Sequence, residues 1–143
     1  MVEHTLMIEE NPNPWDALTI IDCLYEYNRV QTQTKIEDVK RLAIFLRDSQ
    51  NHVVGGILGW MYWGWLQIEF LWIRDDLRGM GFGNDLMIAA EEKALAMGCY
   101  QAYLETFSFQ NTDFYKKLGY EVFGILEDYP RNHNKYFLRK RLR

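Results

Sequence analysis

The amino-acid sequence predicts an α/β domain built on a mixed, partly parallel central sheet of about six to seven strands, with helices on both faces. Three observations lead to this fold class. First, segments 53–62 and 65–73 are apolar almost throughout, which is typical of strands that are covered on both faces. Second, apolar residues recur at helical spacing over 84–97. Third, a strand pattern at 99–105 completes a strand-helix-strand unit, whose two strands are expected to be parallel.

The other elements follow from shorter patterns. Asn13 is typical of a helix cap and Pro14 of a first helical residue, and apolar spacing continues this helix to about Val30. Gly98 and Gly119 are typical of residues that end helices. Short apolar runs bounded by turn residues predict the remaining elements. They are strands at 5–8, 41–46, 120–125 and 136–142 and a short helix at 113–118.

Length and composition indicate one globular domain over residues 1–143. The chain is 48% apolar and 15% aromatic, which is far from the composition of a disordered protein. Its net charge of −4 argues against a nucleic-acid partner, because nucleic-acid-binding domains usually carry a basic balance. The longest apolar stretch, 53–65, is too short and too rich in glycine to span a membrane.

Cysteine usage and the start of the chain bear on the compartment. Cys23 and Cys99 both lie among apolar residues, which favours two free, buried thiols in a reducing compartment. The first residues, Met1 to His4, show no basic segment followed by an apolar run, so no signal peptide is expected. We therefore expect a cytoplasmic protein without a membrane partner.

The segment with the most chemical information is Arg78-Gly79-Met80-Gly81-Phe82-Gly83, which lies between an apolar strand and an amphipathic helix. Glycines let a backbone turn tightly and approach a ligand closely, and the amides at a helix start favour anions. Arg78 adds a fork of donors suited to phosphate. The segment predicts a phosphate or pyrophosphate site, with a purely structural turn as the alternative.

Two nucleotide-binding alternatives depend on further residues. A dinucleotide fingerprint needs Gly-x-Gly-x-x-Gly, but its third glycine position is Asn84 when counted from Gly79 and Leu86 when counted from Gly81. Glu105 does lie at about the sequence separation from the glycines at which the fingerprint has an acid that holds a ribose. No Lys-Ser or Lys-Thr follows the glycines, which excludes a nucleoside-triphosphate loop.

The pattern Arg-x-x-Gly-x-Gly, after an apolar strand and before an alanine-rich helix, resembles the acyl-CoA pyrophosphate loop of the GNAT acetyltransferases. A second segment, Phe114 to Tyr120, is similar to the family's Tyr-x-x-x-Gly-aromatic motif. The resemblance extends from about Val53 to Leu142, and the end of the chain is similar to small bacterial members without an assigned substrate. It implies the GNAT fold, acetyltransferase activity and acetyl-CoA as cosubstrate, with no metal.

The resemblance also implies which residues bind the cosubstrate. In this family the strand before the loop and the next parallel strand separate, and the pantetheine arm fills the gap. The backbone of Leu71 would then face the thioester carbonyl, and Ile73 would bond the pantetheine amides, with Trp72 between them. The residues around the pyrophosphate would be Arg78, Gly79, Met80, Gly81, Phe82, Gly83 and Asn84.

Tyr115 matches the family tyrosine that protonates the leaving thiolate, and a phenol with a pKa of about 10 is suited to that role. An ordinary half-buried aromatic is the alternative. Seven residues earlier, Ser108 occupies the position where the family often has an asparagine that contacts the pantetheine arm. We expect Gln110 or Asn111 to take over this contact.

An amine acceptor must lose a proton before it attacks a thioester. Glu69 lies at even spacing from Leu71 and Ile73, so the three side chains are expected to share a face. An apolar strand around Glu69 should raise the pKa of its carboxylate, which makes Glu69 a candidate general base acting through water. A structural role is the alternative, and Glu105 is a second candidate base.

We therefore expect an N-acetyltransferase that moves an acetyl group from acetyl-CoA directly to a primary amine of a small molecule or a protein in a ternary complex. The aromatic excess and the habit of the family predict a homodimer. Two other functions stay open. A non-catalytic acyl-CoA-binding module would need neither Tyr115 nor a base, and a dinucleotide-binding protein would use the glycine turn alone.

Overall fold

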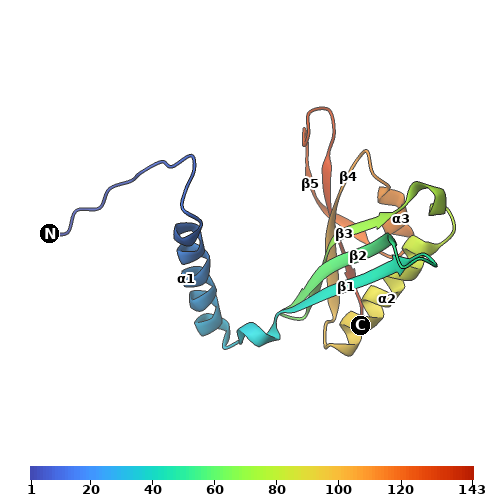
Figure 1. The fold of residues 1–143 in the computed structure, drawn as a ribbon, viewed down its shortest axis with the longest axis horizontal. Helices are drawn as coiled ribbons and strands as arrows, with labels where there is room; N and C mark the ends of the chain where they lie inside the picture. Colours follow the sequence, from blue (N-terminus) through green and yellow to red (C-terminus); the bar gives the residue numbers. More distant parts are fainter. The chain divides into compact units, whose positions relative to one another are not determined.

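The computed structural model covers residues 1–143 and describes all of them except the side chain of Ile36. The chain divides into two compact units, Met1–Ile36 and Glu37–Arg143. All the strands shown in Figure 1 belong to the second unit. The expectation of a single domain over 1–143 stays a prediction.

The first unit contains one helix, α1 (Pro14–Thr32), whose start follows from its sequence. The side-chain oxygen of Asn13 accepts a hydrogen bond from the backbone N–H of Trp15 at 3.0 Å. The predicted cap and first residue are therefore confirmed, and the helix continues slightly past the expected end at Val30. No residue of α1 is buried within this unit, because a single helix has no second element to pack against.

Two expectations for the first unit are wrong. Segment 5–8 forms no strand: a strand needs a neighbour for its backbone hydrogen bonds, and none of the described strands pairs with this segment. Cys23 is exposed on α1, whereas Cys99 in the second unit is buried as expected. Both cysteines are free, and burial raises the pKa of the Cys99 thiol.

The second unit is a six-stranded mixed sheet in the order β1-β2-β3-β4-β6-β5. The β3 and β4 strands are parallel and all other neighbours are antiparallel, which confirms the predicted mixed, partly parallel α/β sheet. The strands are β1 (Lys40–Arg47), β2 (Val53–Tyr62), β3 (Trp65–Ile73), β4 (Gln101–Phe107), β5 (Glu121–Leu126) and β6 (Lys135–Arg141). The helices are α2 (Phe82–Ala96) and α3 (Thr112–Lys117).

The hydrophobic core lies between one face of the sheet and α2, which runs beside the strands in Figure 1. Met87, Ala90 and Ala94 present the apolar side of α2, at the spacing of one helix face. They pack with Ile57 of β2 and Leu66 of β3, and all five residues are fully enclosed. The short helix α3 packs against the same cluster, so both helices of this unit cover one face.

A polar network joins α2 to the last strand. The Glu91 carboxylate accepts hydrogen bonds from the Tyr120 hydroxyl and from the Lys140 ammonium, each at 2.9 Å. Burial and the Glu91 charge raise the pKa of Tyr120, so its hydroxyl remains a donor. These partly buried groups satisfy one another, which fixes the helix against the sheet without leaving an unpaired charge.

The other face of the sheet carries four exposed apolar side chains on neighbouring strands. The register places Leu58 beside Phe70, while Phe45 and Trp72 lie on either side of Gly56. We call Phe45, Leu58, Phe70 and Trp72 the open face, because no helix of the second unit covers them. Helix cover is thus confirmed on the α2 side, and cover of the open face stays a prediction.

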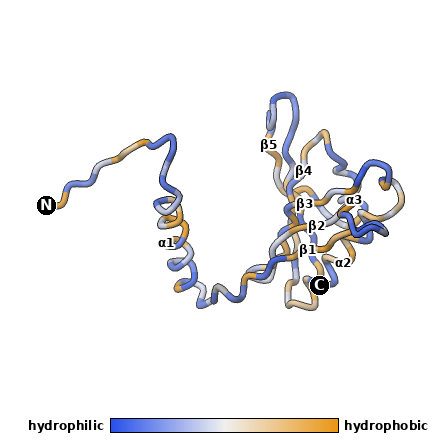
Figure 2. Tube along the Cα trace, viewed as in Figure 1, coloured by the Kyte–Doolittle hydropathy of each residue, from blue (hydrophilic) through white to orange (hydrophobic). Residues whose placement is uncertain are grey.

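The loop between β5 and β6, residues 127–134, is hydrophilic (Figure 2) and projects from one end of the sheet (Figure 1). It is closed by internal hydrogen bonds, including one from the Tyr129 N–H to the His133 carbonyl at 2.8 Å. Ser108 attaches the loop to the end of β4, because its N–H donates to the Asn134 carbonyl and its hydroxyl accepts from the Asn134 N–H. The loop is therefore held close to the carboxyl end of β4.

Candidate active site

The parallel strands β3 and β4 separate partway along their length. They pair with each other from Trp65–Gln101 to Ile68–Leu104. Beyond that point β3 continues to Ile73 and β4 to Phe107, but the two strands no longer pair with each other. The facing backbone edges of the two strands therefore have no ladder partner over these residues. Such a gap can take an extended ligand with amide groups in the manner of an added strand.

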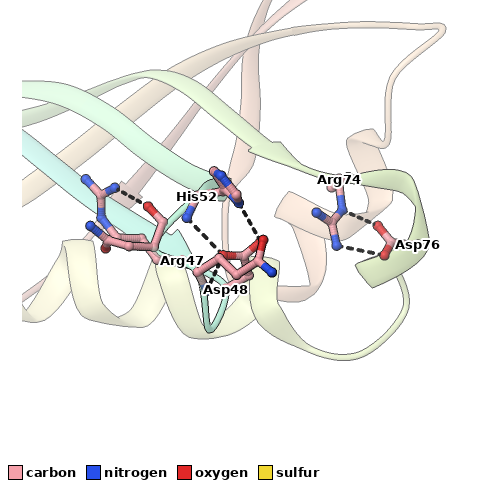
Figure 3. A network of polar contacts seen from close by, with 7 residues as sticks. Arg47, Asp48, His52, Arg74 and Asp76 are labelled. Atoms are coloured by element: carbon pink, nitrogen blue, oxygen red, sulfur yellow. Dashed lines mark hydrogen bonds and ion pairs between the residues drawn. The ribbon is translucent and has the colours of Figure 1, made fainter.

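The turn after β3 is held by arginine and aspartate side chains. Arg74 donates to both carboxylate oxygens of Asp76 at 2.6 and 2.9 Å, as the dashed lines in Figure 3 show. Arg78 donates from Nε to the Ile73 carbonyl at 2.9 Å and pairs with Asp75 at 2.9 Å. These contacts fix the path of the chain from the end of β3 into the glycine segment. They also engage some of the Arg78 guanidinium donors that the sequence analysis assigns to phosphate.

Two glycines of the predicted phosphate loop have backbones that require glycine. Gly79 and Gly81 have φ of 75° and 91°, in the left-handed region that other residues rarely adopt. A Cβ built on either glycine meets no atom within 4 Å, so the loop is open on that side. The requirement for glycine at these positions is therefore conformational, and space for a ligand remains beside the loop.

The glycine segment leads directly into α2. Gly81 is the residue before its first turn, and no side chain caps that end of the helix. Uncapped N–H groups at a helix start are a favourable position for an anion. A Cβ on Gly83 would lie 3.3 Å from Cζ of Phe114, so the first turn of α2 packs closely on α3. The loop and α3 are thus fixed relative to each other.

Tyr115 lies on α3 in a mostly apolar environment. The Asn111 side chain caps this helix by accepting from the Phe114 N–H at 3.1 Å. The Tyr115 ring is half-buried against the rings of Phe114 and Tyr120, with centroids 5.0 and 6.2 Å away. Burial raises the pKa of its phenol above the usual value, so the hydroxyl stays protonated and can act as an acid.

The polar residues before α3 have structural partners. Gln110 accepts through Oε1 from the Thr106 hydroxyl at 3.0 Å and from the Phe107 N–H at 3.1 Å. Asn111 caps α3, and Ser108 binds the loop between β5 and β6. A contact of Ser108 or Asn111 with a pantetheine arm stays a prediction. Their shared effect is to position Tyr115 and the loop at the end of β4.

The expectation that Glu69 shares a face with Leu71 and Ile73 is wrong. Gly59 pairs with Ile68 and Leu58 with Phe70, so Glu69 is an extra residue in β3, a β-bulge. The bulge reverses the alternation of side chains: Leu71 and Ile73 pack on the core, whereas Glu69 is exposed on the opposite side. The enclosed, apolar environment expected around the Glu69 carboxylate is therefore absent.

Glu69 and Glu105 follow immediately after the last paired residues, Ile68 and Leu104, one on each side of the gap. The Glu105 carboxylate forms an ion pair with Lys135 at 2.8 Å, and this hydrogen bond raises the pKa of the lysine. No ion pair of Glu69 is found among the described side chains. Of the two candidate bases, Glu69 is therefore the one whose charge is not already neutralised.

Sequence reasoning did not identify Tyr103 as part of this site. Its half-buried ring packs edge-on against Trp65 at 5.8 Å. Tyr103 pairs with Gln67, two residues before Glu105 and Glu69 on their strands. Burial, and then the charges of Glu105 and Glu69, raise the pKa of its hydroxyl. The available signal was its spacing of two residues from Glu105, which places both side chains on one face of β4.

The remaining predicted binding residues are divided between core and surface. Leu71 and Ile73 pack on the core while their backbone lies along the gap. Trp72 and Met80 are exposed, and neither belongs to the core cluster against which Tyr115 packs. Among the described residues, no group of His, Cys, Asp and Glu side chains could hold a metal ion, and no described helix could span a membrane.

A family model described as the acetyltransferase (GNAT) family matches residues 5–120. A blasticidin-S acetyltransferase of Streptomyces morookaense is 30% identical over 118 residues, which make up 80% of this chain and 87% of that protein.

Two solved structures have the same fold. An acetyltransferase from Bacillus cereus has a TM-score of 0.83 and 31% identity, with 94% of this chain and 97% of that chain covered. An aminoglycoside 6′-N-acetyltransferase complexed with coenzyme A has a TM-score of 0.63 and 20% identity, with 72% of this chain and 73% of that chain covered. At 20% identity, the similarity to the aminoglycoside enzyme is evidence for the fold alone.

Proposed function

The chain belongs to the acetyltransferase (GNAT) family, and from this premise we propose that it moves the acetyl group of acetyl-CoA to a primary amine by direct attack in a ternary complex. The observation that carries the proposal is the separation of β3 and β4 next to the glycine turn. A pantetheine arm in the gap would continue into a pyrophosphate at Gly79 and Gly81. This matches the order of groups in coenzyme A.

Two acid-base residues divide the proton transfers in this proposal. Glu69 accepts a proton from the acceptor ammonium through water, which frees the nitrogen lone pair for attack on the thioester carbonyl. Backbone amides of β3 near Leu71 stabilise the oxyanion that forms. As the C–S bond breaks, Tyr115 protonates the departing thiolate, and the second proton that the nitrogen loses restores the phenol. The products are an amide and free CoA. The open position of Glu69 and the burial of Tyr115 support these assignments.

The proposal also covers the acceptor, the compartment and the oligomeric state. The acceptor is an amine of a small molecule or a protein. The relatives include enzymes named for blasticidin-S and for aminoglycosides, and these names apply to those proteins. We further propose that the protein acts in the cytoplasm as a homodimer, without a nucleic-acid or membrane partner.

The experiment that tests this function measures binding and transfer separately. Purified protein is titrated with acetyl-CoA by calorimetry, then incubated with acetyl-CoA and a library of primary amines. Transfer is read as release of CoA thiol and as an acetyl mass increase on the amine. We expect both signals. Acetyl-CoA binding without transfer to any amine would indicate the non-catalytic module instead, and absence of acetyl-CoA binding would contradict the proposal altogether.

A further inference from the structure

Four side chains surround the Lys135 ammonium at the carboxyl end of β4. The Glu105 carboxylate pairs with it at 2.8 Å. The nitrogen also lies over the rings of Tyr129, Phe137 and Phe107, at 4.7, 5.6 and 5.8 Å from their centroids. The lysine side chain is only 16% exposed as a result. We call Glu105, Phe107, Tyr129 and Phe137 the cation cage.

The cage is built from three separate parts of the chain. Glu105 and Phe107 lie on β4, Phe137 lies on β6 beside Glu105, and Tyr129 comes from the loop between β5 and β6. The rings of Phe107 and Tyr129 stack with centroids 6.0 Å apart, which keeps them in place. A cage assembled from strands and a hydrogen-bonded loop is preorganised, so a cation that enters it need not order the walls.

The position of the cage relates it to acetyl transfer. Glu105 is the first residue of β4 after the pairing with β3 ends, and Glu69 occupies the corresponding position on β3. The pair Tyr103–Gln67 lies two residues before each of these carboxylates, so Glu105 and Glu69 lie on the two strands at the point where they separate. The cage therefore adjoins the gap in which the proposed function places the thioester.

The chemistry of the cage selects cations. Aromatic faces carry negative charge and attract an ammonium or guanidinium, and a carboxylate adds a charge-assisted hydrogen bond. Beyond its Cα, the lysine side chain is a butylammonium ion, so the chain itself shows which ligand the cage accommodates. A lysine side chain has a flexible four-carbon stem, and Lys135 is the first residue of β6. It can leave the cage without moving the backbone.

We propose that the cation cage is a subsite for a second cationic group of the acceptor, and that Lys135 occupies it until an acceptor ammonium or guanidinium replaces the lysine at Glu105. This inference rests on the proposed function and narrows the acceptor to molecules with two cationic groups. Lys135 is then a specificity-determining residue that competes with the acceptor. An alternative role, a purely structural ion pair between β4 and β6, gives different outcomes in the experiments below.

The first experiment measures cage binding without catalysis. Lys135→Ala empties the cage, and n-butylammonium chloride should then raise the melting temperature of the variant by mass action. Wild type and Lys93→Ala, which removes an exposed lysine on α2, should show no such rise. Neutral n-butanol should stabilise none of them. Equal responses of Lys135→Ala and wild type to butylammonium would overturn the proposal.

The second experiment separates KM from kcat with two acceptors of equal length, 1,5-diaminopentane and n-pentylamine. Lys135→Ala should lower KM for the diamine on the order of tenfold, about the strength of one cation–π and carboxylate contact. KM for pentylamine and kcat should stay near wild type, and Lys135→Arg should restore competition. A structural role alone would lower the melting temperature and leave KM for both amines unchanged, which contradicts the proposal.

A third variant keeps the test decisive if Lys135→Ala does not fold. Glu105→Gln retains the size of the side chain and removes its charge, so KM should rise for the diamine and not for pentylamine. An equal rise for both amines would also overturn the proposal. If no amine is acetylated by any variant, the proposed function fails, whereas butylammonium binding still decides whether the cage exists as a cation site.

Discussion

Tyr115 and Glu69 differ in their surroundings, and this difference suits them to opposite proton transfers. The Tyr115 ring is enclosed by Phe114 and Tyr120, and its burial holds the proton on the phenol. Glu69 is exposed on a bulge at the mouth of the gap, where water can carry a proton to it. One residue is therefore arranged as a donor and the other as an acceptor.

Replacing Tyr115 with Phe should lower kcat on the order of 10²-fold, because a positioned acid is lost. Affinity for acetyl-CoA should change little, since the ring and its packing remain. Burial raises the phenol pKa, so wild-type kcat should persist above pH ~10, the pKa of an ordinary phenol, and fall only when Tyr115 loses its proton. This fall should be missing from the variant.

The measurement for Tyr115 is a pH profile of kcat together with an acetyl-CoA titration. Tyr100→Phe is the matched control, because Tyr100 is an exposed tyrosine near the amino end of β4. Full activity of Tyr115→Phe across the pH range would contradict the general-acid role.

Replacing Glu69 with Gln should lower turnover mainly at low pH. There the acceptor is protonated and needs a base, so the defect should shrink as pH rises toward the pKa of the amine. Glu92→Gln serves as the control, since Glu92 is an exposed carboxylate on α2. Turnover measured across pH for both variants checks the prediction, and a defect that is independent of pH would point to a structural role for Glu69.

At the scale of elements, the boundaries of β2 and β3 agree with the sequence prediction at 53–62 and 65–73. The tight turn between them has positive φ at Trp63 and Gly64, which the glycine makes easy to recognise. Apolar runs ended by turn residues are local signals, so one sequence suffices to read them. The cap of α1 at Asn13 was predictable for the same reason.

Regular alternation of side chains along a strand does not predict the bulge at Glu69. The signal was present, since the core-facing residues change from Leu66 and Ile68 to Leu71 and Ile73, an odd step within one strand. The gap between β3 and β4 came only through the family resemblance. The ion pair of Glu105 with Lys135 cannot be predicted from the sequence, because it depends on the long-range pairing of β4 with β6.

The two ends of α2 offer a controlled test of the phosphate loop. Gly81 before the helix and Gly98 after it have φ of 91° and 90°, and a Cβ on either meets no atom within 4 Å. Ala at either position should therefore introduce a similar backbone strain. Only Gly81→Ala should also weaken coenzyme A binding, by about tenfold or more, equivalent to about 1.4 kcal/mol.

Calorimetric titration of both glycine variants with coenzyme A checks this prediction, and their melting temperatures report the shared strain. If Gly98→Ala weakens binding as much as Gly81→Ala, strain in α2 explains the effect and the loop is not a phosphate site.

At the scale of the whole molecule, the open face is a surface of the second unit to which the proposed chemistry assigns no role. Phe45, Leu58, Phe70 and Trp72 are 49%, 37%, 64% and 51% exposed on three adjacent strands. Contiguous apolar surface of this kind usually marks an interaction site. It therefore supports the proposed homodimer, with a second copy of the chain as the partner.

Light scattering at micromolar concentration should give the mass of a dimer for wild type. Phe45→Asp places a charge on the open face and should shift the mass toward the monomer. Ile88→Asp places the same charge at an exposed apolar position of α2 and should leave the dimer intact. A monomeric wild type would contradict the homodimer proposal. Equal masses for the two variants would show that the open face is not the dimer interface.

The separation of β3 and β4 also has a consequence for solubility. Strand edges without partners are templates for pairing with other chains, and proteins normally protect them. In this fold two such edges face each other inside the sheet beyond Ile68 and Leu104. If pantetheine occupies the gap, the cosubstrate protects the edges as it binds. We therefore expect the ligand-free enzyme to aggregate on storage, and added coenzyme A to slow this aggregation.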